Sequence, residues 1–427
     1  MRSSQSPNTL RTHSTSEPVD RMSGTDELTS SWGASIIDTL DSLLVFGLDD
    51  EYKICRPFVN QLNFHWVGGK DWSQEYIFPD SIPSSEDEEE ASEQVWGTDR
   101  DKGVSISVFE TTIRYLGGLL GAYDLSGDQL LVDRAVDLAT ILERAFNTQS
   151  GLPAGHMNPG YEHNFLSIGS LSIAEAASIS LEFMRLAQVT DDRKWHDLAQ
   201  RVTDYIEEKV IPRSQKGNLI PLSFPVDGTG ALYGTYAWGG MADSYYEYLI
   251  KTYKLLGGGQ SAQQYRKIYE ASVDTARQHL FYDITAYDFS STHKGGMIGI
   301  GKTEPGGLHV HEIEHLTCFA GGMLGMGSKL LDRKQDMIDA EKFTQACYWL
   351  SAATPTGLQP EVVEFFEPGF EVWENVTIDG FSYLPPSAGE KSGVEVEERM
   401  KGSPTGSKKV VTRGINRPET IESIFYM

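Results

Sequence analysis

Residues 103–128 read GVSISVFETTIRYLGGLLGAYDLSGD, and this stretch decides the fold. Ser107 and Glu110 fit the capping-box pattern S-x-x-E, in which two side chains satisfy free backbone N–H groups at a helix N-terminus. Apolar residues then recur at helical spacing, at Ile113, Leu116 and Leu120. The pattern predicts one long helix that ends in a tight turn at the sequence Ser-Gly-Asp.

Three glycines, Gly117, Gly118 and Gly121, lie on neighbouring turns of this predicted helix. Each weakens an isolated helix by roughly 1 kcal/mol relative to alanine, so we expect another element to pack closely against the backbone. Glu110 and Arg114 are four residues apart and share one helix face. Glu110 therefore has two interpretations: a capping residue paired with Arg114, which the frequency of capping boxes favours, or a carboxylate at the rim of a cavity.

The same structural unit recurs along the chain: a helix with small residues, a short polar turn, a returning helix and a long loop. The turns lie near Asp128, Asp192, Gly258 and Asp332. No strand-like run of alternating residues competes with this helical pattern. Equivalent hairpins with long loops on one side predict an all-α fold, a closed toroid of helices around a central funnel.

The remaining segments set the expected domain boundaries. Residues 1–30 are rich in Ser and Thr without periodicity and are expected to be disordered. Residues 31–427 are expected to form one barrel domain, with an acidic loop at 80–103 and a polar, disordered insertion at about 380–412. The N-terminus lacks the apolar core of a signal peptide, and no apolar stretch approaches the ~18–20 residues of a membrane span.

Composition excludes several classes of partner and site. The formal net charge of −25 argues against binding to nucleic acid or to an anionic membrane surface. The chain has three cysteines, and none forms a C-x-x-C pair, which argues against a zinc or redox site.

Six motifs occur in an order that resembles a known family. They are GASIIDTLDSL, SVFETTIRYLGGLLGAYDLSGD, ADSYYEYLIK, EHLTCFAGGMLGMG, TGLQPE and RPETIES. Together they look like class I α-mannosidases, glycoside hydrolase family 47, over residues 26–427. The resemblance implies an (α/α)₇ barrel, removal of α-1,2-linked mannose from high-mannose N-glycans or glycoproteins with inversion, and a bound Ca²⁺. It also implies a monomer in the secretory pathway, in the ER or Golgi or secreted.

The resemblance assigns roles to residues that match the family's motifs. Four carboxylates are implied to be catalytic: Glu110 as proton donor, Glu419 as general base, and Asp243 and Glu361 beside them. Three residues are implied to line the sugar pocket: Arg114, Glu182 and His315. Cys318 and Cys347 match the family's disulfide, which leaves Cys55 unpaired.

Each carboxylate also has an ordinary structural interpretation. Asp243 and Glu419 stand at predicted helix starts, where they would serve as caps, and Glu361 follows a proline and would be a first-turn acid. A helix N-terminus favours the ionised form, which suits a base at Glu419 and opposes an acid at Glu110. The order of the motifs favours the functional interpretation for all four.

The chain also departs from the family pattern. The Thr that binds Ca²⁺ in a T-E-x-H-P-like motif has no counterpart, so we assign no metal ligand and expect a barrel that is incomplete at the C-terminus, with an exposed apolar face. Loss of that ligand makes enzymatic activity doubtful. A catalytically inactive, lectin-like glycan-binding protein is therefore the alternative function.

Overall fold

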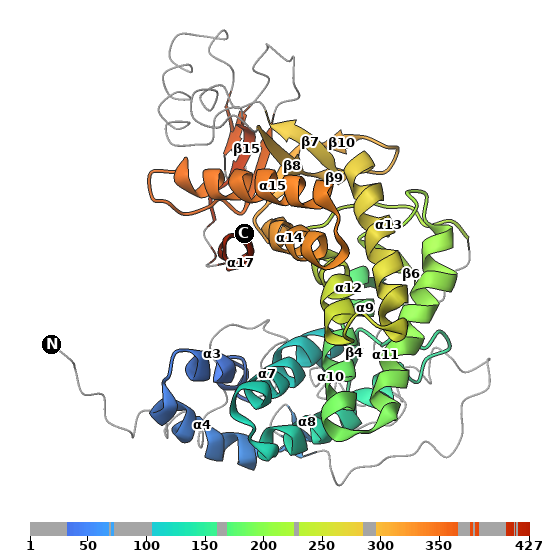
Figure 1. Ribbon diagram of the computed structural model, residues 1–427, viewed down its shortest axis with the longest axis vertical. Helices are drawn as coiled ribbons and strands as arrows, with labels where there is room; N and C mark the ends of the chain where they lie inside the picture. Colours follow the sequence, from blue (N-terminus) through green and yellow to red (C-terminus); the bar gives the residue numbers. More distant parts are fainter. Residues whose placement is uncertain are drawn as a thin grey trace, which may run out of the picture. The chain divides into compact units, whose positions relative to one another are not determined.

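The computed structural model (Figure 1) describes residues 32–67, 70–71, 105–159, 169–225, 230–284, 296–365, 376–378, 381–383, 407–413, 415 and 417–427. The contacts divide the chain into two compact units. Unit 1 comprises Met1–Leu171 and Glu175–Tyr205, and unit 2 comprises Ser172–Ala174 and Ile206–Met427. Residues 1–30, the acidic loop at 80–103 and most of the polar insertion lie outside the described residues. The expectation of one domain over 31–427 stays a prediction.

Unit 1 consists mainly of helices, and its described strands are very short. The helices are α2 (Ala34–Ile37), α3 (Leu40–Val45), α4 (Asp49–Gln61), α6 (Val108–Glu110), the π-helix η2 (Thr111–Leu116), α7 (Gly117–Ser126), α8 (Gln129–Leu142), the 3₁₀ helix η3 (Glu143–Phe146), α10 (Ser180–Thr190) and α11 (Arg193–Tyr205). The strands are β1 (Trp66–Val67), β2 (Lys70–Asp71), β3 (Ile106–Ser107) and β4 (His156–Met157). Strand β5 (Ser170–Ser172) and helix α9 (Ile173–Ala177) follow before α10.

The central helix is confirmed, from Val108 to Ser126, with a π-helical segment after its first turn. The Ser107 hydroxyl accepts a hydrogen bond from the Glu110 N–H at 3.2 Å, which confirms the Ser107 half of the predicted capping box. Close packing at the glycines is also confirmed. A Cβ at Gly118 would lie 2.7 Å from the carbonyl oxygen of Ile37, closer than atoms pack without a shift.

Unit 2 combines helical hairpins with strands. Its helices are η4 (Ile206–Val210), η5 (Ile211–Arg213), α12 (Asp243–Leu255), η6 (Gln260–Ala262), α13 (Gln263–His279), η7 (Leu316–Phe319), α14 (Ala320–Leu331), α15 (Lys334–Ala352) and α17 (Glu419–Tyr426). Its strands are β6 (Ser223–Pro225), β7 (Phe281–Ile284), β8 (Met297–Ile300), β9 (Lys302–Thr303), β10 (His309–Val310), β11 (Glu312–Glu314), β12 (Val362–Phe365), β13 (Val376–Ile378), β14 (Phe381–Tyr383) and β15 (Ser407–Val411).

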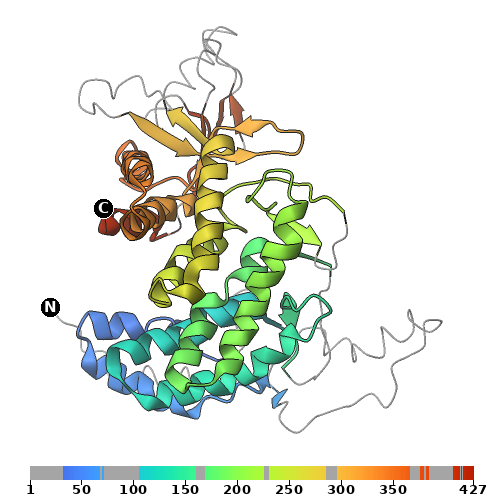
Figure 2. The ribbon, with the colours of Figure 1, turned by 45° about the vertical axis from the view of Figure 1, so that its right-hand side comes forward.

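The predicted hairpins are present, and polar or glycine residues close them. Helices α7 and α8, α10 and α11, α12 and α13, and α14 and α15 pack in pairs (Figures 1 and 2). Asp191 and Asp332 adopt left-handed backbone conformations at two of the turns, with φ of 54° and 55°. Asp and Asn tolerate this backbone region better than other non-glycine residues do. An Asp at these positions is therefore a sequence signal for the turn.

The prediction that no strand competes with the helical pattern is wrong. Five strands of unit 2 form a sheet in the order β11–β12–β15–β13–β14, in which β13 and β15 are parallel and the other pairs antiparallel. Strand β15 lies within the segment predicted as a disordered insertion, so that prediction fails for Ser407–Val411. These strands are three to five residues long, too short to show alternation, and most of their pairings join segments that are distant in sequence.

Helix α14 offers α17 a face of glycines. A Cβ at Gly321 would lie 3.0 Å from the Ser423 hydroxyl, and one at Gly322 would lie 2.7 Å from the ring of Tyr426. The Ser423 hydroxyl accepts from the Gly322 N–H at 2.8 Å and donates to the carbonyl oxygen of Cys318 at 2.5 Å. Side chains at these two glycines would push α17 away, so α14 must lack them for α17 to pack where it does.

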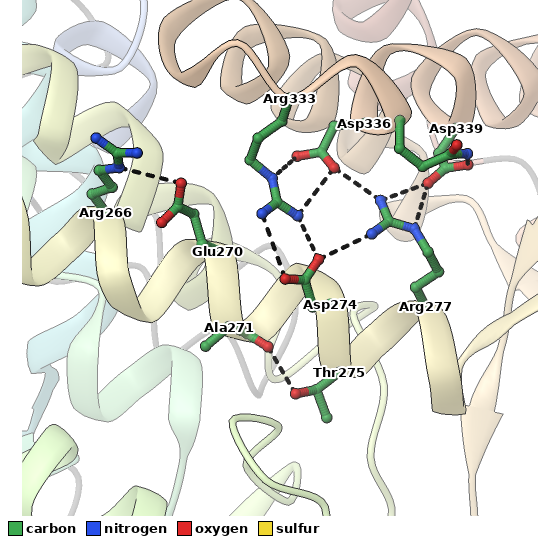
Figure 3. Close-up of polar contacts among 10 residues, drawn as sticks. Arg266, Glu270, Ala271, Asp274, Thr275, Arg277, Arg333, Asp336 and Asp339 are labelled. Atoms are coloured by element: carbon green, nitrogen blue, oxygen red, sulfur yellow. Dashed lines mark hydrogen bonds and ion pairs between the residues drawn. The ribbon is translucent and has the colours of Figure 1, made fainter.

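Buried charges hold α13 against the α14–α15 hairpin. Figure 3 shows two arginines among three aspartates. Arg277 donates to Asp339 at 2.7 Å and to Asp336 at 2.8 Å, and Arg333 donates to Asp336 at 2.7 Å and to Asp274 at 2.5 Å. Asp336 is fully buried, so both of its oxygens need these partners. Removing one arginine would leave an uncompensated charge, which makes this network a strong constraint on helix packing.

The glycine packing in unit 1 gives a matched pair of variants. Gly118→Ala should lower the free energy of unfolding by ~1–3 kcal/mol, because the new methyl group meets the Ile37 carbonyl. Gly121→Ala should raise it by up to ~1 kcal/mol, because the nearest atom there, in Asp41, would be at an ordinary 3.6 Å and alanine favours the helix. Urea unfolding measures both, and equal effects of the two substitutions would contradict the packing.

Candidate active site

Asp243 begins α12, whose buried face carries Tyr245, Tyr246 and Leu249. The Asp243 Oδ1 accepts a hydrogen bond from the Ser244 N–H at 2.8 Å. Burial raises the pKa of Asp243 to about 6, and the negative charges of Glu247 and Glu314 add to the rise, while the Ser244 N–H opposes it. Asp243 is therefore a first-turn carboxylate held partly in its neutral form near pH 6.

Glu419 begins α17, and the residues after it anchor this short helix. Thr420 donates a hydrogen bond to the buried side chain of Gln359 at 2.6 Å. The Gln359 amide in turn donates to the sulfur of Cys318 at 3.2 Å. With Ser423, these contacts fix the N-terminal turn of α17, and so the position of the Glu419 backbone.

The Glu419 carboxylate lies in surroundings that disfavour its charged form. Its Oε2 is buried and has no hydrogen-bond partner among the described residues. Burial raises its pKa to about 7; Asp243 and Glu422 raise it further, and Arg417 opposes them. We expected the helix N-terminus to favour the ionised form, but here desolvation is the larger effect.

Glu361 is not a first-turn acid, so that interpretation is wrong. It lies in an extended segment before β12, where its N–H donates to the carbonyl oxygen of Val411 at 2.9 Å. Both of its carboxylate oxygens accept from the Nε of Arg417 at 2.9 Å, and the Arg417 Nη2 donates as well. Glu361 is thus a charged partner that fixes Arg417 just before α17.

His315 lies beside this ion pair. Its N–H donates to the carbonyl oxygen of Glu361 at 2.8 Å, and only 7% of the residue is exposed. Its Nδ1 has no hydrogen-bond partner in the described part of the chain. Burial lowers the pKa of His315; Glu361 opposes this and Arg417 reinforces it. A neutral imidazole with a free ring nitrogen suits hydrogen bonding to a sugar hydroxyl.

Unit 1 holds three other predicted residues and pairs two of them. Arg114 donates to the Glu110 carboxylate at 2.8 Å and to Asp38 at 3.4 Å. Glu182 is buried on α10, and its Oε1 lies 3.4 Å from where a Cβ at Gly117 would stand. The predicted pair of Glu110 and Arg114 is confirmed, and the π-helical segment that contains Arg114 follows Glu110 directly. Such segments are frequent at functional sites.

The sequence interpretation missed several charged residues of the site in unit 2. Arg417 was quoted only as part of a motif, although it pairs with Glu361 and faces Glu419. Glu247 and Lys251 were not singled out, although they follow Asp243 at steps of four residues on α12. That helical spacing was a usable signal, because such residues share one face.

The disulfide assigned by resemblance is present. Cys318 and Cys347 are bonded, with their Cα atoms 5.9 Å apart, and Cys55 is free. The bond links η7 to α15, directly beneath the contacts that anchor α17. It therefore supports the helix that carries Glu419.

Comparison with known proteins identifies the family. Residues 9–427 match the sequence profile of Glycosyl hydrolase family 47. The chain belongs to this family. The match covers the motif region and extends N-terminal to residue 26, where the motif resemblance begins.

Similar proteins include several named mannosidases. The chain is 28% identical to the endoplasmic reticulum mannosyl-oligosaccharide 1,2-alpha-mannosidase of Homo sapiens, over 93% of this chain and 47% of that protein. It is 32% identical to the corresponding protein of Schizosaccharomyces pombe, over 80% of this chain and 60% of that one. The chain spans about half the length of the curated relatives it matches.

The fold comparison agrees with the family. The alpha-1,2-mannosidase from Trichoderma reesei matches 96% of this chain and 74% of its own, with a TM-score of 0.70 and 26% identity. The predicted fold class, an all-α (α/α)₇ barrel, is confirmed as the fold of this family, with the strands above as additions. Its incompleteness at the C-terminus stays a prediction.

Two further findings concern the surroundings of the protein and its cofactor. No described helix is long and apolar enough to cross a membrane. Family membership is consistent with Ca²⁺ as a typical cofactor, and Ca²⁺ takes about six to eight oxygen ligands. Across the described ranges, however, no three His, Cys, Asp or Glu side chains group as metal ligands, and Arg417 occupies the oxygens of Glu361. These residues alone do not supply a Ca²⁺ site.

The raised pKa of Glu419 predicts a specific effect on stability. Its folded-state pKa of about 7 exceeds the ordinary value of 4.5, so Glu419 contributes stability at low pH that is lost as pH rises through about 7. Glu419→Gln, which cannot ionise, should exceed wild type by ~1 kcal/mol at pH 8, allowing for partial exposure, and match it at pH 4. Urea unfolding at the two pH values tests this. An equal difference at both would show that Glu419 is not perturbed.

Proposed function

We propose that the chain is an inverting glycosidase that removes terminal α-1,2-linked mannose from high-mannose N-glycans. The observation that carries this proposal is the pair of neighbouring first-turn carboxylates, Asp243 and Glu419, whose pKa values burial raises to about 6 and about 7. Their setting in a member of glycosyl hydrolase family 47 supplies the substrate class. The similar proteins named above carry mannosidase names, and none of the comparisons favours the glycan-binding alternative.

Inverting hydrolysis needs one carboxylic acid to protonate the leaving oxygen and one carboxylate to activate water on the opposite face of the sugar. We assign the base to Glu419, because its Oε2 has no protein hydrogen-bond partner among the described residues and its raised pKa of about 7 suits a proton acceptor. We assign the proton donor to Glu110, whose carboxylate Arg114 orients at 2.8 Å.

We assign to the other residues the roles of binding the substrate and orienting the catalytic groups. Arg417, fixed by Glu361, places a positive charge near Glu419 and Asp243 and opposes the rise in the pKa of Glu419. His315, Arg114 and Glu182 keep the sugar-binding roles that the family resemblance implies, and the Nδ1 of His315 has no hydrogen-bond partner among the described residues. Asp243 keeps a second negative charge near Glu419, which increases the basicity of that carboxylate.

We propose that the protein acts as a monomer in the secretory pathway, in the ER or Golgi or after secretion. The support is the endoplasmic reticulum origin named for the human and fission yeast relatives. N-glycans are attached to proteins in that pathway, so enzyme and substrate would meet there.

Mannose release from a high-mannose N-glycan by this 427-residue chain tests the proposed function. Activity should fall as pH drops below about 7, because Glu419 must be ionised to act as the base, and the profile should reflect Asp243 and Glu419 as a coupled pair. Glu419→Gln should lower kcat by ~10²–10⁴-fold.

Glu341→Gln is the matched control, because Glu341 is an exposed carboxylate on α15, and it should leave activity unchanged. Activity that persists in Glu419→Gln would overturn the assignment of the base. A folded wild-type chain that releases no mannose would overturn the proposed function itself.

A further inference from the structure

A charged bridge lies beside the proposed base and plays no part in the mechanism above. The Lys251 Nζ contacts the Glu247 Oε1 at 2.5 Å and the Glu422 Oε1 at 3.2 Å. Glu247 and Lys251 belong to α12, and Glu422 belongs to α17. We call these three residues the Lys251 bridge. It ties the helix that carries Asp243 to the helix that carries Glu419.

The spacing of the residues relates the bridge to the site. On α12, Asp243, Glu247 and Lys251 follow at intervals of four residues and share one face. On α17, Glu419 and Glu422 are three residues apart and share a face as well. Each bridge glutamate is thus one helical turn from a site carboxylate, so a shift at the bridge is transmitted to the site through one turn of rigid helix.

The charges make Lys251 indispensable to this contact. All three side chains are largely buried, with exposed fractions of 26% for Lys251, 17% for Glu247 and 31% for Glu422. Burial alone would lower the pKa of Lys251, but Glu247 and Glu422 raise it above its ordinary value, so the ammonium is charged. Burial and Glu422 raise the pKa of Glu247, and Lys251 opposes them. Without Lys251 the two glutamates would repel each other.

Other described contacts of α17 are made to residues outside α12. Ser423 and Thr420 hold α17 to the Cys318 carbonyl and to Gln359. Those contacts do not involve α12. Loss of the Lys251 bridge would therefore leave α17 attached to η7 and α14 while removing the ion pair that sets its distance from Asp243.

We propose that Lys251 is a positioning residue that fixes Glu419 relative to Asp243. The catalytic part of this proposal rests on the proposed function of Glu419 as the general base. Lys251 acts through the two glutamates and does not touch the substrate. A misplaced base costs rate more than it costs binding, so the effect should fall on kcat.

The test compares three lysine variants of the 427-residue chain. Lys251→Met should lower kcat for mannose release by ~10–100-fold, with KM within about twofold of wild type. Lys251→Arg keeps the charge and should restore kcat to within about threefold of wild type. Lys267→Met is the matched control, because Lys267 pairs with Glu207 in unit 2 but is 75% exposed, and it should leave both constants unchanged.

Hydrogen exchange supplies a readout that does not require activity. Lys251→Met should speed amide exchange in α17 while α13 and α15 exchange as in wild type, whereas a general loss of stability would speed exchange in all three. If Lys251→Met does not fold, Glu422→Gln replaces it, because it removes the α17 side of the bridge and leaves the Glu247–Lys251 pair intact. The same changes in kcat and in α17 exchange are expected.

The outcomes separate the two proposals. A folded Lys251→Met protein with wild-type kcat and wild-type exchange in α17 overturns the positioning role. A kcat loss accompanied by faster exchange throughout unit 2 also overturns it, because that result describes a structural residue. If wild type releases no mannose, the proposed function fails, and exchange in α17 alone then decides whether Lys251 positions this helix.

Discussion

The packing of α17 against the glycine face of α14 is the contact on which the candidate site depends. Gly321 and Gly322 bring the two backbones close enough for Ser423 to bond both the Gly322 N–H and the Cys318 carbonyl. The disulfide of Cys318 and Cys347 lies beneath that contact. Because α17 is only eight residues long, it has little stability of its own and takes its position from these partners.

With α17 held in place, Glu361 and Glu419 have different surroundings although both are glutamates. Glu361 faces the guanidinium of Arg417 and serves as its ionic partner. Glu419 lies two residues further along the chain from that arginine, near Asp243, and burial raises its pKa to about 7. One carboxylate is thus held in an ion pair, and burial disfavours the charged form of the other.

Local features of the sequence predicted most of the helical framework. The apolar spacing and the cap at Ser107 located the central helix, and the turns at Asp191 and Asp332 follow from short-range backbone preferences. The strands were not predicted because all of them are short, and several pair with segments far away in the chain, as β12 does with β15. Local periodicity carries no information about such pairings.

The candidate site could also be predicted only in part from the sequence. Motif resemblance located Asp243, Glu361 and Glu419, but it did not predict the ion pair of Glu361 with Arg417. The position of Glu419 at a helix N-terminus predicts that it is ionised. The burial that opposes ionisation depends on the tertiary packing of α17, which the sequence does not show. The bridge of Lys251 to Glu422 joins residues that are 171 positions apart, a contact that no local pattern reveals.

The stereochemistry of the released sugar tests the central claim most directly. Proton NMR can follow the anomeric signals while the chain hydrolyses an α-1,2-linked mannobiose, before mutarotation mixes the products. The account predicts that β-mannose forms first, because an inverting mechanism converts an α-linkage into a β-anomer. Initial formation of α-mannose would contradict it, since a covalent intermediate on the enzyme would then be required.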